Sequence, residues 1–452
     1  MSFWELAAHA PGDVVLVDVD GTAVDRTALL ERVRALEEQL TGFGPRSFGF
    51  LLCANRVEDI ALLLACLRRG HVPLLLSADM PADQLEALAA HYGPDWIAGR
   101  AGPTGPVPQP SRGTPAAVLH PALGLLLSTS GSTGSPRLVR LSREALDANA
   151  RSIAAYLTLS GDERAITSLP MNYSYGLSVI NSHLAAGGTL VLNNDSVMSR
   201  EFLQRLEDHR VTSLAGVPSM YQMLARTGFF KRPAPALRTL TQAGGKLDDR
   251  MTRLVAEAAE ANGLRFFVMY GQTEASARIS FVPPERLAGK IGSIGIAIPG
   301  GRLDVAPDSG ELIYEGPNVM LGYAQHPADL ALGDELGGRL ATGDLGRVDE
   351  DGFFYITGRL KRFVKISGNR IGLDEVEQAL QAHLPGLVSV GGKDDGLVVW
   401  IESGDAAAID AAKTFLRDQF MIHHSMVKLR LVDHLPLLPT GKKDYSPLLS
   451  SQ

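Results

Sequence analysis

The stretch best suited to chemistry is residues 128–137, which read Ser-Thr-Ser-Gly-Ser-Thr-Gly-Ser-Pro-Arg. It follows an apolar run at residues 123–127, and every position except Arg137 is hydroxylated, glycine or proline. Glycine permits close approach and positive φ, so such a loop can turn several backbone N–H groups and hydroxyls toward one anion. The Gly-Lys-Ser/Thr ending of a Walker loop is missing. We interpret the stretch as a phosphate-binding loop, although alone it would equally fit a flexible Ser/Gly linker.

Other side chains suited to nucleotide chemistry follow short apolar runs. Tyr270 ends one such run and offers a ring face for a base, while Thr273 and Glu274 bring a hydroxyl and a carboxylate directly afterwards. Asp344 has two acceptor oxygens that suit the paired hydroxyls of a ribose, and Arg359 would add donors. The alternatives are a solvated side chain for Glu274 and an ordinary turn aspartate for Asp344.

In their order along the chain, these residues resemble the motif series of the acyl-adenylate-forming superfamily. This superfamily comprises acyl- and aryl-CoA ligases, firefly luciferase and the adenylation domains of peptide synthetases. The resemblance covers roughly residues 14–447 and is carried by residues 128–137, Tyr270-Gly-Gln-Thr-Glu274, Gly310-Glu-Leu, Gly322-Tyr323, Thr342-Gly-Asp344, Gly358-Arg359 and Gly441-Lys442. It implies ATP- and Mg²⁺-dependent activation of a carboxylic acid to an acyl-adenylate, with release of pyrophosphate. Transfer to a thiol of CoA, or to the phosphopantetheine of an acyl carrier protein, would follow.

The resemblance also implies roles for individual residues. Lys442 would be the catalytic lysine, with Thr273 and Glu274 beside the phosphates, and Glu274 would hold the metal. A cation there would stabilise the charge that develops at the α-phosphate. Nucleotide contacts are implied for Thr129, Ser130, Gly131, Ser132, Thr133, Gly134, Arg137, Ala243, Gly244, Gly245, Tyr270, Gly271, Gln272, Asp344 and Arg359. The remaining roles are the substrate pocket (Tyr173, Tyr175, Gly176, Val217 and Ser276), the inter-domain hinge (Lys361) and the thiol-side loop (Ser367 and Gly368).

Two positions depart from the family pattern. Arg137 stands where the phosphate loop usually ends in Lys, which keeps the charge but replaces a point charge with a planar fork. Tyr173 stands where acyl-CoA ligases usually have His and amino-acid-activating domains have Asp. Because a tyrosine does not pair with an ammonium group, we expect an aryl or aliphatic acid rather than an amino acid, and an uncharged body for it.

The elements that must position these residues alternate between short apolar runs and helix-like stretches. Residues 14–17 and 48–53 read as strands, and residues 29–40 and 57–67 read as helices. This alternation predicts a layered α/β fold with buried parallel strands, followed by a β-rich subdomain after about residue 290. We expect a large N-terminal domain at 1–360 with several sheets and a small mobile α+β lid at 361–452.

Composition limits the partners. The 452 residues carry a formal net charge of -7 without a basic block, so nucleic acid and anionic membranes are not expected partners. The two cysteines, Cys53 and Cys66, lie in apolar stretches and read as free buried thiols. With no signal-like start and no apolar run near 20 residues, we expect a cytoplasmic protein that uses a small-molecule acid. The oligomeric state is left open.

Two other hypotheses remain at this stage. The stretch Asp18-Val-Asp20-Gly-Thr matches the opening of haloacid-dehalogenase-type phosphatases, in which Asp18 would be the nucleophile and Asp20 the acid/base. That match covers about 25 residues and leaves the loop at 128–137 and Lys442 unexplained. A non-catalytic nucleotide-binding protein would keep the loop and Asp344 but would not need Lys442.

Overall fold

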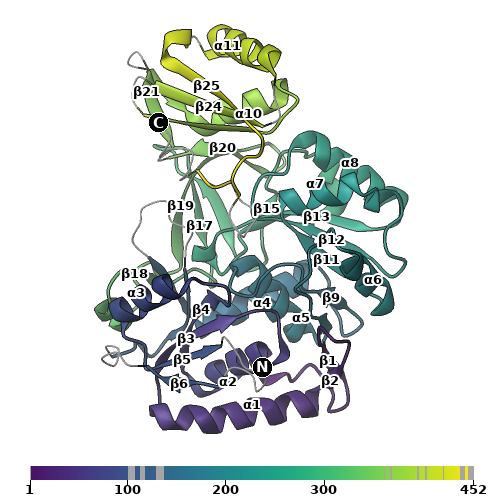
Figure 1. Cartoon of the computed structure of the whole chain (residues 1–452), viewed down its shortest axis with the longest axis vertical. Coiled ribbons are helices and arrows are strands. Elements are labelled where there is room, and N and C mark those ends of the chain that lie inside the picture. The colour runs from purple at the N-terminus through teal and green to yellow at the C-terminus, as the bar shows by residue number, and fades with distance from the viewer. Residues whose placement is uncertain are drawn as a thin grey trace. The chain divides into compact units, whose positions relative to one another are not determined.

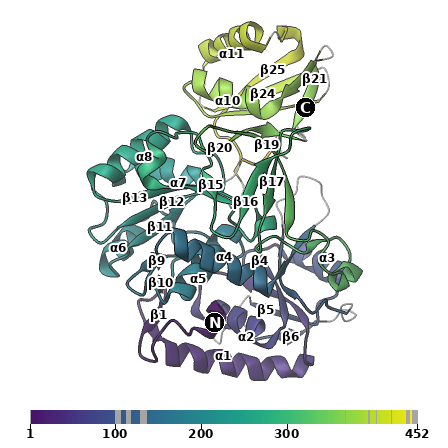
Figure 2. The same cartoon turned by 180° about the vertical axis from the view of Figure 1, so that it is seen from behind.

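The computed structural model describes residues 2–99, 107–111, 118–128, 137–360, 362–366, 369–393, 396–402, 405–420, 422–437 and 443–445. The chain forms two compact units (Figures 1 and 2). The first comprises residues 1–303 and 314–340, and the second residues 304–313 and 341–452.

One sheet of the first unit has the strand order β15-β14-β13-β12-β11-β9-β10-β1-β2. Neighbouring strands from β13 to β1 pair in parallel, whereas β2, β14 and β15 pair antiparallel at the two edges. The strands are β1 (Val14–Val17), β2 (Ala23–Asp25), β9 (Arg164–Ile166), β10 (Thr189–Val191), β11 (Ser213–Gly216), β12 (Thr239–Gln242), β13 (Arg265–Tyr270), β14 (Ser280–Val282) and β15 (Ile296–Ala297).

A second sheet in this unit has the order β18-β8-β7-β4-β3-β5-β6. Its centre, β7-β4-β3-β5, is parallel, and β3 is buried along its whole length. Strands buried on both faces read as continuous apolar runs, as residues 48–53 do. The strands are β3 (Phe48–Cys53), β4 (Val72–Ser77), β5 (Trp96–Gly99), β6 (Gln109–Pro110), β7 (Leu123–Ser128), β8 (Leu138–Ser142) and β18 (Gly322–Ala324).

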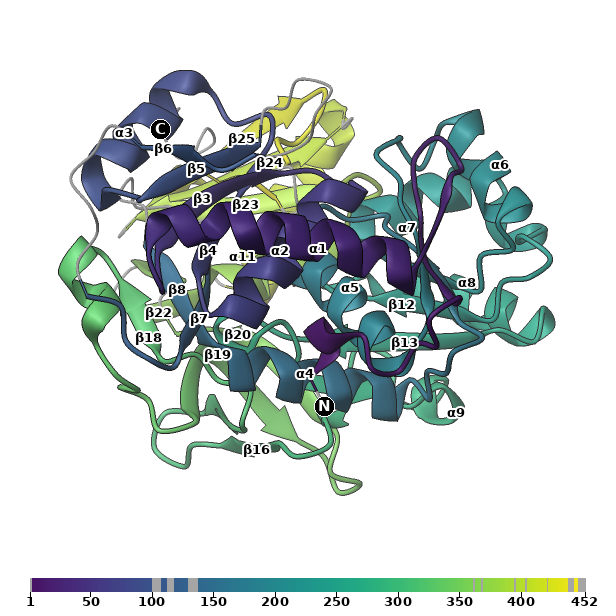
Figure 3. The ribbon, with the colours of Figure 1, turned by 90° about the horizontal axis from the view of Figure 1, so that it is seen from below.

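The helices of the first unit cover and join these sheets (Figure 3). One apolar cluster contains side chains of both sheets together with α1, α2, α4 and α5, and α2 is buried from Asp59 to Leu67. Side-chain caps start several helices: Asp25 accepts from the Ala28 N–H, and Ser142 from the Ala145 N–H. The helices are α1 (Arg26–Leu40), α2 (Val57–Arg69), α3 (Ala82–Tyr92), α4 (Arg143–Tyr156), α5 (Ser174–Ala186), α6 (Arg200–Asp208), α7 (Pro218–Arg226), α8 (Asp249–Ala261) and α9 (Pro284–Leu287), with 3₁₀ turns η1 (Phe3–Glu5), η2 (Thr41–Phe43), η3 (Phe229–Lys231), η4 (Thr273–Ala275) and η5 (Pro327–Ala331).

The C-terminal part of the chain is rich in antiparallel strands. Sheet β16-β17-β19-β20 contains the points at which the chain passes between the two units, and hairpin β21-β22 and sheet β23-β24-β25 follow it. Helices α10 and α11 share one apolar cluster with these later strands. The elements are β16 (Arg302–Val305), β17 (Glu311–Glu315), β19 (Arg339–Val348), β20 (Phe354–Arg359), β21 (Phe363–Ile366), β22 (Asn369–Gly372), α10 (Leu373–His383), β23 (Val388–Lys393), β24 (Gly396–Glu402), α11 (Ala406–Phe420), η6 (His424–Met426) and β25 (Val427–Val432).

The α/β fold predicted from the sequence is confirmed, including the β-rich region after residue 290 and the small α+β unit near the C-terminus. Cys53 and Cys66 are free and buried. None of the helices in the described ranges combines the length and apolarity needed to span a lipid bilayer. That residues 361–452 form a lid that moves as a separate domain stays a prediction.

Candidate active site

The turn after β13 holds Tyr270, Gly271, Gln272, Thr273 and Glu274 in a tightly folded backbone. A Cβ on Gly271 would lie 1.8 Å from the backbone oxygen of Ala277, so no other residue fits there. Directly after η4, Ser276 and Ala277 adopt φ values of 52° and 105°, which L-residues rarely do. Strain of this kind concentrates at functional sites, where the surrounding structure enforces it.

Helix α5 begins against this turn. The Ser174 hydroxyl, in the first position of the helix, lies 3.1 Å from the Thr273 hydroxyl. Within the turn, the side-chain amide of Gln272 donates to the Tyr270 hydroxyl at 3.1 Å. The half-buried Thr273 is therefore fixed from the side of α5, with its hydroxyl at the carboxyl end of the parallel strands, where α/β sheets bind ligands.

Glu274 joins the turn to β18 and to the segment just before that strand. Its Oε1 accepts a hydrogen bond of 2.7 Å from the Tyr323 hydroxyl, and its backbone oxygen accepts one of 2.8 Å from the Met320 N–H. The Arg137 guanidinium lies 3.7 Å from the centre of the Tyr323 ring. Burial raises the pKa of Tyr323 and the neighbouring Glu274 carboxylate raises it further, so Tyr323 remains a neutral donor.

The Glu274 carboxylate fits a magnesium ion that takes its other ligands from phosphates. Its Oε2 accepts no hydrogen bond within the part of the chain that the structure describes. Mg²⁺ is usually held by one or two carboxylates plus substrate phosphates and water rather than by an all-protein cage. No cluster of three or more His, Cys, Asp or Glu with metal-binding geometry occurs among the described residues.

A wall of small residues follows β12. The side-chain amide of Gln242 donates to the backbone oxygens of Ala243, at 3.2 Å, and Gly245, at 2.8 Å. Gly244 has φ +82°, and a Cβ on it would lie 2.5 Å from the Tyr173 hydroxyl and 3.0 Å from Val217 Cγ1. The structure therefore brings Tyr173 and Val217, both predicted for the substrate pocket, together beside Gly244, which was predicted to contact the nucleotide.

The other predicted pocket residues are packed more deeply. Tyr175 is buried, and its hydroxyl donates to the Thr241 backbone oxygen at 2.8 Å. Gly176 faces backbone, since a Cβ on it would lie 2.2 Å from the oxygen of Pro170. The buried Ser276 hydroxyl donates to the Asn318 backbone oxygen at 2.9 Å. These contacts give Tyr175, Gly176 and Ser276 structural tasks in addition to any contact with a substrate.

In the second unit, Asp344 and Arg359 face each other across β19 and β20. Arg359 Nε donates to Asp344 Oδ1 at 3.1 Å, and the two residues are paired in register. The Asp344 side chain is 5% exposed and that of Arg359 is 63% exposed. The arrangement presents a buried carboxylate with a largely exposed cation beside it, a donor and acceptor set that suits a vicinal diol.

An ion cluster that sequence reasoning missed surrounds Glu377 on α10. Its carboxylate accepts from Lys443 Nζ at 2.7 Å, Arg362 Nη2 at 2.9 Å and the Tyr445 hydroxyl at 2.9 Å. Burial alone would raise the pKa of Glu377, but Lys443 and Arg362 together lower it. The sequence feature that could have revealed this cluster is that Glu377 lies on the apolar face of a helix, among Leu373, Val376 and Leu380.

Several predicted site residues lie outside the described residues: Thr129, Ser130, Gly131, Ser132, Thr133, Gly134, Lys361, Ser367, Gly368 and Lys442. Lys443, the neighbour of Lys442, is engaged by Glu377. Asp18 and Asp20, which the phosphatase hypothesis requires, lie in the turn between β1 and β2. There, Asp20 Oδ1 accepts from the Thr22 N–H at 2.8 Å, an ordinary turn contact.

Comparison with known proteins agrees with this geometry. Residues 3–324 match the family described as AMP-binding enzyme. A feruloyl-CoA synthase of Amycolatopsis sp. is 31% identical over 342 residues, 70% of this chain and 67% of the relative. A sulfoacetate–CoA ligase of Cupriavidus necator is 30% identical over 398 residues, which are 84% of this chain and 73% of the relative. The structure of o-succinylbenzoate CoA synthetase from Bacillus subtilis with its acyl-adenylate intermediate has a TM-score of 0.81 at 22% identity, covering 98% and 97%.

Proposed function

Because the chain belongs to the family of AMP-binding enzymes, we propose that it activates a carboxylic acid with ATP and transfers the acyl group to CoA. The substrate carboxylate attacks the α-phosphate of ATP, an acyl-adenylate forms and pyrophosphate leaves. The thiol then attacks the acyl carbon, and AMP leaves. The observation that carries the proposal is the cluster of Arg137, Tyr323, Glu274 and Thr273 at the end of β13.

The chain's own residues bind, orient and stabilise in this reaction. Thr273, held by Ser174, donates to a phosphate oxygen, and the Tyr270 ring packs against the adenine. Glu274, held by Tyr323, binds Mg²⁺, which neutralises phosphate charge. Asp344 accepts hydrogen bonds from the ribose hydroxyls, and the wall formed by Ala243, Gly244 and Gly245 leaves room for the nucleotide and the acid.

We assign the catalytic cation to Lys442, which follows Gly441. Lys443 is the poorer candidate because its ammonium is already engaged by the buried Glu377 carboxylate. We also propose that residues 361–452 form a lid that turns about Lys361, presenting Lys442 for adenylation and the loop at Ser367 and Gly368 for the thiol step. Rotation of this kind separates two half-reactions in one site.

The acid is aryl or aliphatic. At the position of Tyr173 the chain has no carboxylate to pair with an α-ammonium group, which disfavours amino acids. CoA is the thiol acceptor, and the names of two relatives, feruloyl-CoA synthase and sulfoacetate–CoA ligase, support this assignment. An acyl carrier protein is the second candidate acceptor, and we place the reaction in the cytoplasm. The phosphatase hypothesis is wrong, because the AMP-binding family covers the residues on which it rested.

A screen of pyrophosphate release over aromatic, fatty, hydroxy and amino acids, with and without CoA, tests the proposal. We expect release that depends on a non-amino acid and falls by about 10²–10³ in Lys442→Ala, the effect of removing one transition-state charge partner. Binding of ATP should survive. The matched control is Lys428→Ala, an exposed lysine on β25, which should retain full activity. Pyrophosphate release that is strongest with amino acids, or that is equal in Lys442→Ala, would contradict the assignment.

A further inference from the structure

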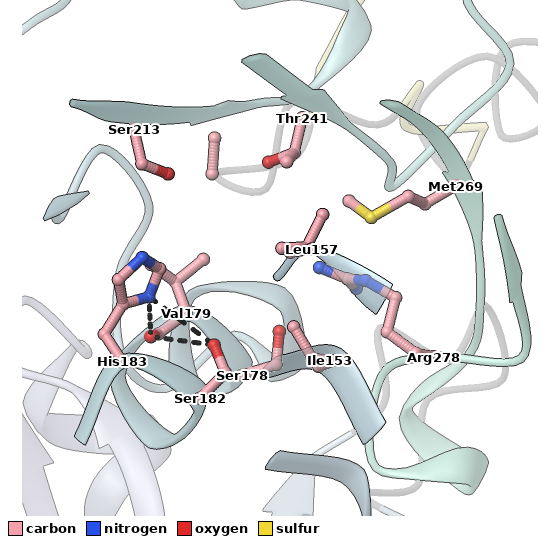
Figure 4. Close-up of a pocket in the computed structure, with 11 residues that line it drawn as sticks. Ile153, Leu157, Ser178, Val179, Ser182, His183, Ser213, Thr241, Met269 and Arg278 are labelled. Atoms are coloured by element: carbon pink, nitrogen blue, oxygen red, sulfur yellow. Dashed lines mark hydrogen bonds between the residues drawn. The ribbon is translucent and has the colours of Figure 1, made fainter. Parts of the chain in front are cut away.

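A small cavity lies between α4, α5 and the strands β11, β12 and β13 (Figure 4). It encloses about 10 Å³, room for about one water molecule. Polar side chains from several elements line it: Ser178, Ser182, His183, Ser213, Thr241 and Arg278. Polar atoms converging on a buried space from different elements are typical of a site that fixes one end of a ligand.

Arg278 is the unusual member of this lining. The residue is 2% exposed, and its Nε is buried without a hydrogen-bond partner. Its contacts are with neutral groups: Nη1 donates to the Ala277 backbone oxygen at 3.1 Å, the Tyr156 hydroxyl interacts with it, and the Tyr175 ring centre lies 4.1 Å away. Among the described residues, no carboxylate forms an ion pair with it.

A buried guanidinium without a counter-charge is destabilising, and stacking on a tyrosine offsets only part of that effect. Arg140 shows the usual solution in this protein. It is equally buried, but it pairs with Glu335 and donates to several backbone oxygens. Arg278 therefore has the burial of a structural arginine without the anion that normally accompanies one.

Arg278 is close to the site of chemistry. Burial raises the pKa of Tyr173 to about 12, and the nearby Arg278 guanidinium opposes this rise. The Tyr173 hydroxyl borders Gly244, so Tyr173 connects the surroundings of Arg278 with the wall of small residues. Along α5, Ser178 stands one turn, about 6 Å, beyond the Ser174 that touches Thr273. A short acid that begins at Thr273 would end at the cavity.

We propose that the substrate carries a second carboxylate and that Arg278 binds it. This inference rests on the proposed function and specifies its substrate class as a short dicarboxylic acid. It also replaces the expectation of an acid with an uncharged body, and it adds a reason to exclude amino acids, since Arg278 repels an ammonium group. The cavity has to widen when the acid enters, and the unbranched Met269 in its lining can move to allow this.

His183 completes the cavity with an acceptor. Its Nδ1 donates to the Val179 backbone oxygen at 2.8 Å, which leaves the lone pair on Nε2, and Nε2 is buried without a partner. Burial lowers the pKa of His183, so the ring stays neutral and does not repel Arg278. In Figure 4 the His183 ring and the Arg278 guanidinium lie on opposite sides of the set of residues that line the cavity. A carboxylate at Arg278 with a water or hydroxyl at His183 would satisfy both.

The test measures the activity of the whole chain on diacids and on monoacids of the same length. The diacids are succinate, glutarate and adipate, and the matching monoacids are butyrate, valerate and hexanoate. For wild type we expect kcat/KM of pyrophosphate release to favour one diacid over its monoacid by at least about 100-fold, because a buried charged partner rejects an analogue that leaves it unpaired. Arg278→Met should lose that preference and gain activity with the monoacid. Arg278→Lys, which keeps the charge, should retain part of the diacid preference.

Two controls separate the outcomes. Arg238→Met, at a half-exposed arginine outside the cavity, should keep the wild-type preference, and the unfolding temperature of each variant reports whether it is folded. Equal wild-type activity on diacid and monoacid overturns the inference and leaves the proposed function standing. So does an Arg278→Met variant that is folded and slowed equally on both acids, which would make Arg278 structural. If no acid of any class yields pyrophosphate, the proposed function fails and this inference fails with it.

Discussion

Single residues set the shape of the proposed acid pocket, and Gly244 is the clearest case. Its φ of +82° is costly for any other residue, and the space beside it is already filled by Tyr173 and Val217. At Gly244 the chain therefore presents backbone alone to the proposed nucleotide and acid sites. The close approach of Tyr173 and Val217 to Gly244 explains why a glycine stands at this position.

Gly244→Ala should therefore change substrate use as well as stability. We expect a loss of about 1 kcal/mol in the free energy of unfolding from the left-handed backbone, and a rise of roughly tenfold in KM for the acid as the Cβ displaces Tyr173. Gly228→Ala is the control, because Gly228 has φ +76° with open space around it. Steady-state kinetics and denaturant unfolding of both variants check this. Equal KM values in the two would show that the wall does not limit the pocket.

At the scale of elements, α10 is anchored by the charge cluster on Glu377. The Glu377 side chain is 12% exposed, and those of its partners Arg362 and Lys443 are 17% and 24% exposed. The cluster joins α10, β23 and the segment that carries Lys443 and Tyr445. Removing one partner of such a group leaves uncompensated buried charge, which destabilises far more than loss of an exposed pair.

Glu377→Ala should lower the free energy of unfolding of the C-terminal unit by about 3 kcal/mol. The pH dependence has a definite sign. Because the pKa of Glu377 is lowered by folding, its contribution is fully present above its ordinary value of 4.5 and is lost as pH falls through the lower folded value. The gap in unfolding midpoint between wild type and Glu377→Ala should thus shrink below pH 4.5.

The exposed Glu375 on the same helix provides the control, and Glu375→Ala should unfold like wild type at every pH. Thermal melts monitored by circular dichroism from pH 3 to 7 would measure all three proteins. A gap that stays constant down to pH 3 would mean that Glu377 is not charged in the folded protein.

At the scale of the whole molecule, the sequence was sufficient for the fold class, because buried parallel strands appear as unbroken apolar runs such as residues 48–53. It also singled out Thr273 and Glu274 directly after an apolar run, where consecutive residues carry the pattern. It did not reveal contacts between distant segments: Glu274 with Tyr323, 49 residues apart, or Glu377 with Lys443, 66 apart. Nor did it reveal Arg278, since an arginine beside a short strand reads as exposed until the packing around it is known.

The central claim concerns which bond forms, and an isotope experiment tests it most directly. The preferred acid, labelled with ¹⁸O in its carboxylate, is incubated with ATP, Mg²⁺, CoA and the full-length protein, and the products are examined by mass spectrometry. If the carboxylate attacks the α-phosphate and the thiol then breaks the acyl C–O bond, one ¹⁸O must appear in AMP. Label in inorganic phosphate together with ADP, or unlabelled AMP, would contradict the account.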